Sequence, residues 1–229
     1  MTIAVVIPAA GVGQRMQADR PKQYLELAGK TILEHTVQRL RQVPDLGPVW
    51  LALAKDDPYF AATPLALRPD IHRVTGGSER ADSVLAALMA IDAKEYPWVL
   101  VHDAARPLVH VADIQKLIKR CLDSGCGGIL ATPVRDTMKR SMGASENTQV
   151  LHTVERSDLW HALTPQLFPT AQLKDILQKA LQSGALITDE ASALEWAGLP
   201  VLLVSGRADN IKITQSEDLL LARFYLEQQ

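Results

Sequence analysis

The sequence is poor in cysteine and has no excess of charge of either sign. Of its 229 residues only Cys121 and Cys126 are cysteines, spaced neither as CxxC nor with a histidine at metal-ligand spacing. We therefore expect two reduced, structural cysteines in a cytoplasmic protein. The formal net charge is -2, from 24 basic and 26 acidic residues. This balance favours neither nucleic acid nor an anionic membrane as a partner, so a few local cations would have to hold any anionic substrate.

Long apolar runs are also missing. None approaches the roughly 20 residues that span a bilayer. The apolar stretch Ile3–Ala10 has no basic residues before it and contains Pro8, which favours a buried first strand over a signal peptide. The composition, 47% hydrophobic and 22% charged, excludes a disordered chain. It predicts a single domain over residues 1–229 with a well-formed core.

Short apolar runs alternate with amphipathic segments along the chain. The runs predict strands at Ile3–Ile7, Val49–Leu53, Ile71–Val74, Trp98–Val101, Gly128–Thr132 and Val201–Val204. Helices are expected after Thr31, at Ser83–Ile91, around Ile114–Cys121, at Leu173–Leu181 and Glu190–Ala197, and after a cap at Ser216. This order predicts an α/β fold with a mainly parallel sheet covered by helices on both faces. Ligands of such sheets bind beyond the carboxyl ends of the strands.

One stretch, residues 133–155, breaks the alternation. Pro133–Glu155 has few large apolar residues, two short extended segments and a polar middle. It predicts a hairpin arm that projects from the domain. Long loops in compact domains tend to be either functional or disordered. From these residues alone, a solvated loop and an arm that embraces a second subunit both stay open.

The first predicted strand ends in a loop of small residues. Pro8–Gly13 is followed by Arg15 and then by Lys22. Small residues let backbone N–H groups approach a polyphosphate, and the two cations add charge-assisted donors. The pattern is neither GxGxxG nor a Walker loop, so dinucleotide and Walker sites do not fit. We interpret the loop as a phosphate-binding site rather than as an ordinary turn with surface cations.

Two further motifs follow predicted strands. Gly76–Ser83 leads into a helix, and its glycines allow close backbone approach; alternatively, its polar residues only cap that helix. His102–Pro107 follows the strand Trp98–Val101. Asp103 is well placed there for Mg²⁺, and Arg106 for a substrate phosphate. The alternative is that Asp103 and Arg106 pair with each other.

Two segments carry cations in less specific surroundings. The arm contains Arg135–Arg140 and returns through His152–Arg156, which is locally basic; a solvated charge run is the usual case. Lys212 lies in an otherwise apolar stretch within Gly206–Thr214. A lysine in that position points to a function.

Taken together, these motifs resemble the 2-C-methyl-D-erythritol 4-phosphate cytidylyltransferase family, from about Ile3 to about Phe224. The matching segments, in order, are PAAGVGQRM, PKQY, GGSERADSV, VHDAARP, PVRDTMKR, LWHALTPQ, TDEASALE and GRADNIKIT. The resemblance implies a Rossmann-like three-layer nucleotidyltransferase fold with a mainly parallel twisted sheet and a protruding β-hairpin arm. It also implies a homodimer in which the arm, about residues 133–155, reaches the partner's site.

The resemblance implies a role for individual residues. Catalysis is assigned to Arg15, Lys22 and Lys212. Nucleotide binding is assigned to Pro8, Ala9, Ala10, Gly11, Val12, Gly13, Gly77, Ser78, Ser83, Asp103 and Ala104. Binding of the methylerythritol phosphate is assigned to Asp103, Arg106, Thr137, Arg156, Thr164, Thr188 and Lys212. Mg²⁺ or another divalent cation would be held mainly through CTP phosphates, with Asp103, and less directly Asp209, as protein ligands.

Two positions depart from the family pattern. Ser78 stands where some relatives have an aspartate, and Gln14 where a second basic residue is common. The expected reaction is attack of an acceptor phosphate oxygen on the α-phosphorus of CTP, with pyrophosphate leaving. Alternatives are a cytidylyltransferase for ribitol 5-phosphate or another polyol or sugar phosphate, and a catalytically silent nucleotide-binding protein. No membrane or nucleic acid partner is expected.

Overall fold

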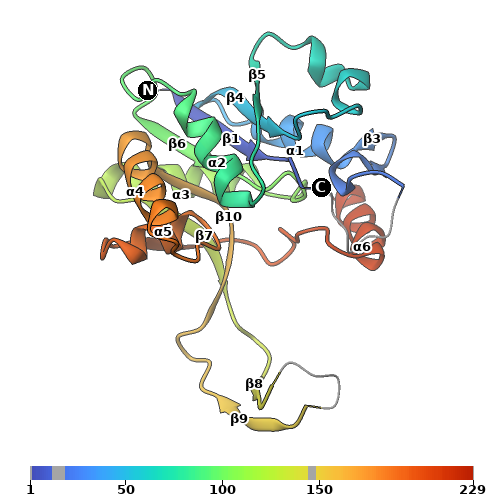
Figure 1. Cartoon of the computed structure of the whole chain (residues 1–229). Coiled ribbons are helices and arrows are strands. Elements are labelled where there is room, and N and C mark those ends of the chain that lie inside the picture. The colour runs from blue at the N-terminus through green and yellow to red at the C-terminus, as the bar shows by residue number, and fades with distance from the viewer. Residues whose placement is uncertain (1, 12–18, 144–147, 229) are drawn as a thin grey trace.

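A seven-stranded sheet forms the centre of the computed structural model, which describes residues 2–11, 19–143 and 148–228 (Figure 1). In chain order its strands are β1 (Ile3–Pro8), β4 (Leu46–Leu53), β5 (Ile71–Thr75), β6 (Trp98–Val101), β7 (Gly128–Pro133), β10 (Trp160–Pro169) and β11 (Leu202–Ser205). Their order across the sheet is β11-β7-β10-β6-β1-β4-β5. All neighbours pair in parallel except β10, which is antiparallel to both β6 and β7. The predicted, mainly parallel sheet is therefore confirmed.

Five helices form the layers on the two faces of the sheet. They are α1 (Ile32–Leu40), α2 (Arg80–Met89), α3 (Val111–Ser124), α4 (Thr170–Gln182) and α5 (Glu190–Trp196). Alternate residues of β1 point to opposite faces: Val5 packs in one core with α1 and α3, and Val6 in a second core with α2, α4 and α5. Because both faces are covered, β1 is a continuous apolar run. A third core joins α6 (Ser216–Glu227) to Leu27 and Ile213.

The structure differs from the predicted elements most clearly at a missed strand and at a predicted helix cap. The sequence-based prediction contained no strand at Trp160–Pro169, which is β10, because Pro165 and Pro169 argue against a central strand. The register of β10 against β7 shifts between Ala162 and Gln166, which accommodates Pro165. The predicted cap at Ser216 was also wrong: Ser216 is the first helical residue, and Gln215 precedes it as the N-cap.

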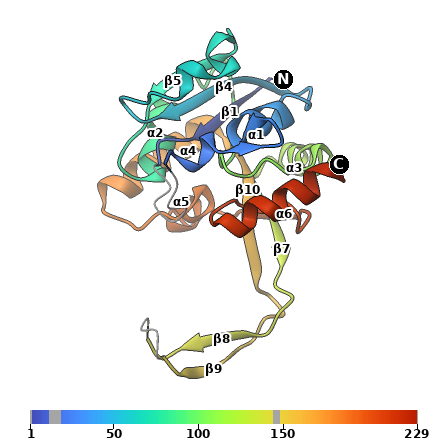
Figure 2. The same cartoon turned by 90° about the vertical axis from the view of Figure 1, so that its right-hand side faces the viewer.

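The predicted arm is present. Strands β8 (Met138–Ser141) and β9 (Val150–Val154) pair as an antiparallel hairpin that stands away from the domain in two perpendicular views (Figures 1 and 2). A second small sheet pairs β2 (Glu26–Leu27) with β3 (Lys30–Thr31). Short 3-10 turns lie at η2 (Lys22–Tyr24), η3 (Phe60–Ala62) and η4 (Pro64–Leu67). Among the described residues, every helix is too short or too polar to cross a membrane.

The approach of Gly127 to Phe168 yields a test of the packing. A Cβ atom at Gly127 would lie 2.6 Å from Cε1 of the fully buried Phe168 ring and closer still to Cδ1. Gly127→Ala should therefore lower the unfolding free energy by about 1–3 kcal/mol, the usual cost of overpacking a core. Gly143→Ala is the matched control, because its Cβ would meet no atom within 4 Å. Equal urea midpoints for the two variants would contradict this packing.

Candidate functional site

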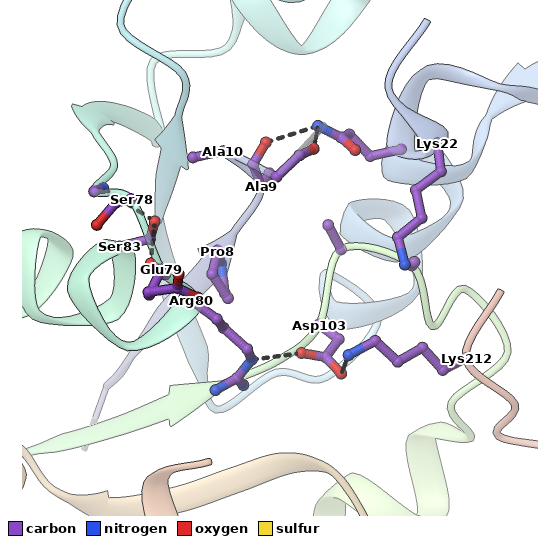
Figure 3. Close-up of a pocket in the computed structure, with 15 residues that line it drawn as sticks. Pro8, Ala9, Ala10, Lys22, Ser78, Glu79, Arg80, Ser83, Asp103 and Lys212 are labelled. Atoms are coloured by element: carbon purple, nitrogen blue, oxygen red, sulfur yellow. Dashed lines mark hydrogen bonds and ion pairs between the residues drawn. The ribbon is translucent and has the colours of Figure 1, made fainter. Parts of the chain in front are cut away.

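A pocket opens at the carboxyl ends of β1, β5 and β6 (Figure 3). Its lining residues come from the end of β1, from the segments that follow these strands as far as the start of α2, and from Lys22, Gln23 and Lys212. They are Pro8, Ala9, Ala10, Gly11, Lys22, Gln23, Gly77, Ser78, Glu79, Arg80, Ser83, Asp103, Ala104, Ala105 and Lys212. Every predicted nucleotide-binding residue in the described part of the chain is among them. Val12, Gly13 and Arg15 lie outside the described residues.

Sequence reasoning missed Gln23, Glu79, Arg80 and Ala105 as lining residues. Gln23 is buried, and its Nε2 donates to the carbonyl oxygens of Ala9 at 2.7 Å and Gly11 at 3.3 Å. These two hydrogen bonds hold the loop Ala9–Gly11 in place. The signal was present in the sequence, since Gln23 directly follows Lys22 within the same motif.

The second loop is folded on itself by its own polar side chains. The Ser83 hydroxyl accepts from the N–H of Gly77 and donates to the carbonyl of Glu79, both at 3.1 Å. The Ser78 hydroxyl donates to Asp82, which also accepts from the N–H of Glu79. Asp82 thus caps the backbone of Glu79, the N-cap residue, whereas Ser78 bonds only the Asp82 side chain; α2 begins at Arg80 and not at the expected Ser83. Gly77, Ser78 and Ser83 nevertheless line the pocket, and their contact with a base stays a prediction.

Gly76 explains why the two loops meet. A Cβ atom at Gly76 would lie 2.6 Å from the Cβ of Ala10 and 2.8 Å from Oγ of Ser83. No side chain fits between the loops at this point. The glycine therefore closes one wall of the pocket by letting the first loop contact the second.

Asp103 is the centre of an ion-pair cluster. Its Oδ1 lies 2.9 Å from Nε of Arg80, and its Oδ2 lies 2.9 Å from Nζ of Lys212 and 3.4 Å from Nε of Arg106. Figure 3 shows Arg80 and Lys212 reaching the carboxylate from opposite sides. Burial by itself would raise the pKa of Asp103, but Arg80, Lys212 and Arg106 together outweigh it and hold the pKa well below its usual range. Asp103 is therefore ionised at neutral pH.

The backbone of Asp103 is fixed by a buried, neutral histidine. Nε2 of His102 lies 3.0 Å from the carbonyl of Arg106, which can only accept, so Nε2 carries the proton. Nδ1 therefore accepts from the hydroxyl of Thr164 at 3.0 Å, and that oxygen accepts from the N–H of Asp103 at 3.0 Å. Burial lowers the pKa of His102 to about 4, which keeps the ring neutral. Neither the tautomer nor the network was foreseen from the sequence.

Arg106 and Asn210 connect this network to the Lys212 segment. Nη1 of Arg106 donates to the carbonyl of Asn210 at 2.7 Å, and Nδ2 of Asn210 donates to the carbonyl of Thr164 at 2.8 Å. The pairing of Arg106 with Asp103, left open by the sequence, is thus observed. Burial, opposed by Asp103, lowers the pKa of Arg106. The grip of Arg106 on a phosphate stays a prediction.

A second pocket adjoins the first at the ion-pair cluster. Its lining residues are Arg80, Asp103, Arg106, Ala162, Leu163, Thr164, Gln166, Thr188, Asp189 and Lys212. Five of the residues assigned to the acceptor, Asp103, Arg106, Thr164, Thr188 and Lys212, are among them. The remaining two, Thr137 and Arg156, are exposed residues of the arm and line neither pocket. Arg80, Asp103 and Lys212 belong to both pockets, so two ligands could meet there.

The described residues place the carboxylate of Asp103, but no cage of carboxylates, where a divalent cation was predicted. Among them, no group of three or more metal-ligating side chains converges. Both oxygens of Asp103 contact cations. Asp209 pairs instead with Arg207 at 2.6 Å. The donor set therefore fits Mg²⁺ only if phosphate oxygens of a nucleotide supply most of the ligands, as Mg²⁺ commonly requires.

Comparison with known proteins gives concordant results. The family model described as "IspD: 2-C-methyl-D-erythritol 4-phosphate cytidylyltransferase" matches residues 3–228. The protein of that name from Photobacterium profundum is 59% identical over 227 residues, 99% of this chain and 97% of that protein. Its counterpart from Vibrio atlanticus is 57% identical over 228 residues, 99% and 96% of the two chains. The crystal structure of the Francisella tularensis protein of that name superposes with a TM-score of 0.83 at 35% identity, covering 98% of this chain and all of that one.

The neutral His102 predicts a pH dependence of stability. The folded-state pKa is about 4, below the unfolded value near 6.5. Below pH ~6.5 the unfolded chain therefore binds a proton that the folded chain does not, and stability falls as the pH falls toward 4. Between pH 7.5 and 5 this group should cost about 2 kcal/mol of unfolding free energy.

Urea unfolding of wild type and His102→Asn at both pH values measures this contribution. The variant should be less stable at pH 7.5, but its further loss on going to pH 5 should be about 2 kcal/mol smaller than that of wild type. His152→Gln, at an exposed arm position, is the control and should keep the wild-type pH dependence. Identical pH dependence in wild type and His102→Asn would rule out the neutral buried ring.

Proposed function

Because this chain belongs to the 2-C-methyl-D-erythritol 4-phosphate cytidylyltransferase family, we propose that its two adjoining pockets hold the two substrates of that family's reaction. The chain is a nucleotidyltransferase that moves the cytidylyl group of CTP to 2-C-methyl-D-erythritol 4-phosphate. It thereby serves isoprenoid precursor biosynthesis by the non-mevalonate route. One observation carries the assignment of the pockets: they meet at Asp103 and Lys212.

The first pocket is the nucleotide site in this proposal. The loop Ala9–Gly11 brings small residues and the backbone of Ala10 and Gly11 to its edge, while the N–H of Ala9 donates to the carbonyl of Ala52; Lys22 points its amine into the cavity (Figure 3). A triphosphate placed there would meet N–H groups and a cation, the surroundings that bind phosphate. Arg15 belongs to the same loop in sequence and is proposed as a second cation for the phosphates.

The second pocket holds the acceptor, and the reaction runs between the two. A phosphate oxygen of the acceptor forms a bond to the α-phosphorus of CTP, and the bond to the bridging oxygen breaks in line. That oxygen leaves with pyrophosphate. The attacking oxygen is already anionic at pH 7, so no general base is required. The barrier comes from bringing two anions together, and Lys22 and Lys212 lower it by their positive charge.

A divalent cation completes the proposed nucleotide site. Its ligands would be phosphate oxygens, with Asp103 as the protein carboxylate within reach. When bound, such an ion neutralises phosphate charge and aligns the triphosphate. The chain's own residues meanwhile orient the reactants: Thr164 fixes the backbone of Asp103, and Asn210 holds Arg106 beside the acceptor pocket.

The arm is proposed to join two copies of the chain. Thr137 and Arg156 flank the hairpin and are exposed, away from both pockets of their own chain. The hairpin also exposes the apolar side chains of Met142, Val150 and Leu151 to between 56% and 65%. Such a surface is one that a second copy would cover. In the homodimer each arm would bring Thr137 and Arg156 to the acceptor pocket of the partner.

A cytoplasmic location is part of the proposal. Cys121 and Cys126 are both free, in keeping with the reduced cysteines expected from the sequence. Burial raises the pKa of the Cys121 thiol to about 12, so this residue is an unreactive core side chain.

The activity is tested by release of pyrophosphate from purified protein with Mg²⁺. CTP, UTP, ATP and GTP are each combined with methylerythritol phosphate and with ribitol 5-phosphate. We expect release with CTP and methylerythritol phosphate alone, and none after addition of EDTA. Release with ribitol 5-phosphate instead would move the acceptor to that alternative. No pyrophosphate release in any combination would contradict the enzymatic function. Release in the presence of EDTA would contradict the requirement for a divalent cation.

The shared site is tested by mixing two inactive variants. Lys22→Ala removes a pocket cation, and we expect kcat to fall by about 10²-fold or more. Arg156→Ala removes an arm cation and should be similarly impaired. In a heterodimer one of the two sites combines an intact pocket with an intact arm, so mixed and reassociated subunits should regain roughly a quarter to a half of wild-type activity, as expected for a symmetric dimer. No recovery in confirmed heterodimers would show that each site is built from one chain.

A further inference from the structure

Arg80 and Glu190 form a partly buried ion pair to which neither the family motifs nor the mechanism above assigns a role. Nη1 and Nη2 of Arg80 donate to Oε1 and Oε2 of Glu190 at 2.7 and 3.1 Å. Glu190 is 1% exposed. The two residues are 110 positions apart, on α2 and α5. Removing two charges from water is costly unless their geometry is good, and this fork-to-fork pair has such geometry.

The residues on either side of Glu190 are both bonded to one glutamine side chain. Asp189 accepts from Nε2 of Gln166 at 2.9 Å, and the N–H of Ala191 donates to Oε1 of the same glutamine at 3.0 Å. Gln166 belongs to β10 and is itself buried. Glu190 is therefore fixed relative to the central sheet, and Arg80 is fixed by Glu190.

This arrangement determines which atoms Arg80 offers to the site. With both terminal nitrogens bonded to Glu190, Arg80 meets Asp103 through Nε alone, at Oδ1. The other oxygen, Oδ2, is left for Lys212 and Arg106. A guanidinium without Glu190 could instead pair through two nitrogens with Asp103, because a fork-to-fork contact is the stronger geometry. Lys212 would then lose its place at Oδ2.

Lys212 is the most exposed of the three cations at Asp103. Its side chain is 36% exposed, against 26% for Arg80 and 11% for Arg106. It is therefore the cation best able to turn from Asp103 to an incoming phosphate. Asp103 would then remain paired with Arg80 and Arg106, so its buried charge would stay compensated during the reaction.

We propose that Glu190 is a positioning residue that acts through Arg80 to keep Asp103 oriented with Oδ2 toward Lys212. This inference rests on the proposed function, since the reaction provides its readout. Glu190, the first residue of α5, lies far in sequence from the loop Ala9–Gly11, yet it would help to fix the geometry of the reacting centre.

The test compares Glu190→Gln with Glu195→Gln, an exposed position on the same helix. The first variant keeps the shape of the side chain and removes its charge. With CTP saturating, we expect Glu190→Gln to lower kcat roughly 10- to 100-fold and to raise KM for the acceptor. Glu195→Gln should match wild type. A residue with only a structural role would change the folded fraction, measured by urea unfolding, and leave KM for the acceptor unchanged.

A double-mutant cycle tests whether Glu190 acts through Arg80. Arg80→Met leaves Glu190 buried and unpaired, whereas the double variant Arg80→Met with Glu190→Gln removes both charges. We expect the double variant to be at least as active as Arg80→Met alone, because the second change has nothing left to disturb. If Glu190→Gln cannot be purified, Glu190→Asp withdraws the carboxylate from the guanidinium and should give the same kinetic change.

The outcomes are separable. Absence of cytidylyl transfer in wild type contradicts the proposed function itself. An active wild type with Glu190→Gln and Glu190→Asp within twofold of it in kcat and acceptor KM overturns the role of Glu190. If the fold-decrease in kcat of the double variant equals the product of the decreases in Glu190→Gln and Arg80→Met, Glu190 does not act through Arg80.

Discussion

The carboxylate of Asp103 lies 2.9 Å from each of two cations and 3.4 Å from a third, and the rest of the site depends on this contact. Taking a carboxylate out of water costs several kcal/mol even after relaxation. That cost is offset here because the cations arrive from three separate segments: Arg80 at the start of α2, Arg106 just beyond β6, and Lys212 beyond β11. A charge that needs three segments to compensate it also fixes their positions relative to one another.

The sheet brings these segments together through one strand that runs against the rest. Because β10 is antiparallel, Thr164 and Gln166 lie beside the carboxyl end of β6. Thr164 bonds the backbone of Asp103 through its hydroxyl, and Gln166 fixes the start of α5 and with it Glu190. A parallel β10 would reverse this segment and place other residues at the end of β6. The antiparallel strand therefore serves the site as much as the core.

The sequence was sufficient for features that depend on local pattern and insufficient for those that depend on pairing across the fold. Strands such as β1 are buried on both faces, so their apolar runs could be found without knowledge of the topology. The loop residues of the first pocket follow those strands directly and were identified for the same reason. β10 was missed because prolines are usually excluded from central strands. Glu190 was missed because its partner, Arg80, is 110 positions away and a neighbour only in space.

The charge balance of the cluster fits a site that must accept anions yet remain folded without them. Arg80, Arg106 and Lys212 carry three positive charges, and Asp103 and Glu190 carry two negative ones, which leaves a net charge of +1. A cluster of cations alone would attract phosphates more strongly, but its own repulsion in a partly buried site would destabilise the empty protein. Asp103 and Glu190 reduce this repulsion. They hold Arg80 and Arg106 in place, while the more exposed Lys212 stays available to a substrate. The two buried carboxylates thus make it possible for one domain to concentrate positive charge where two anionic substrates have to meet.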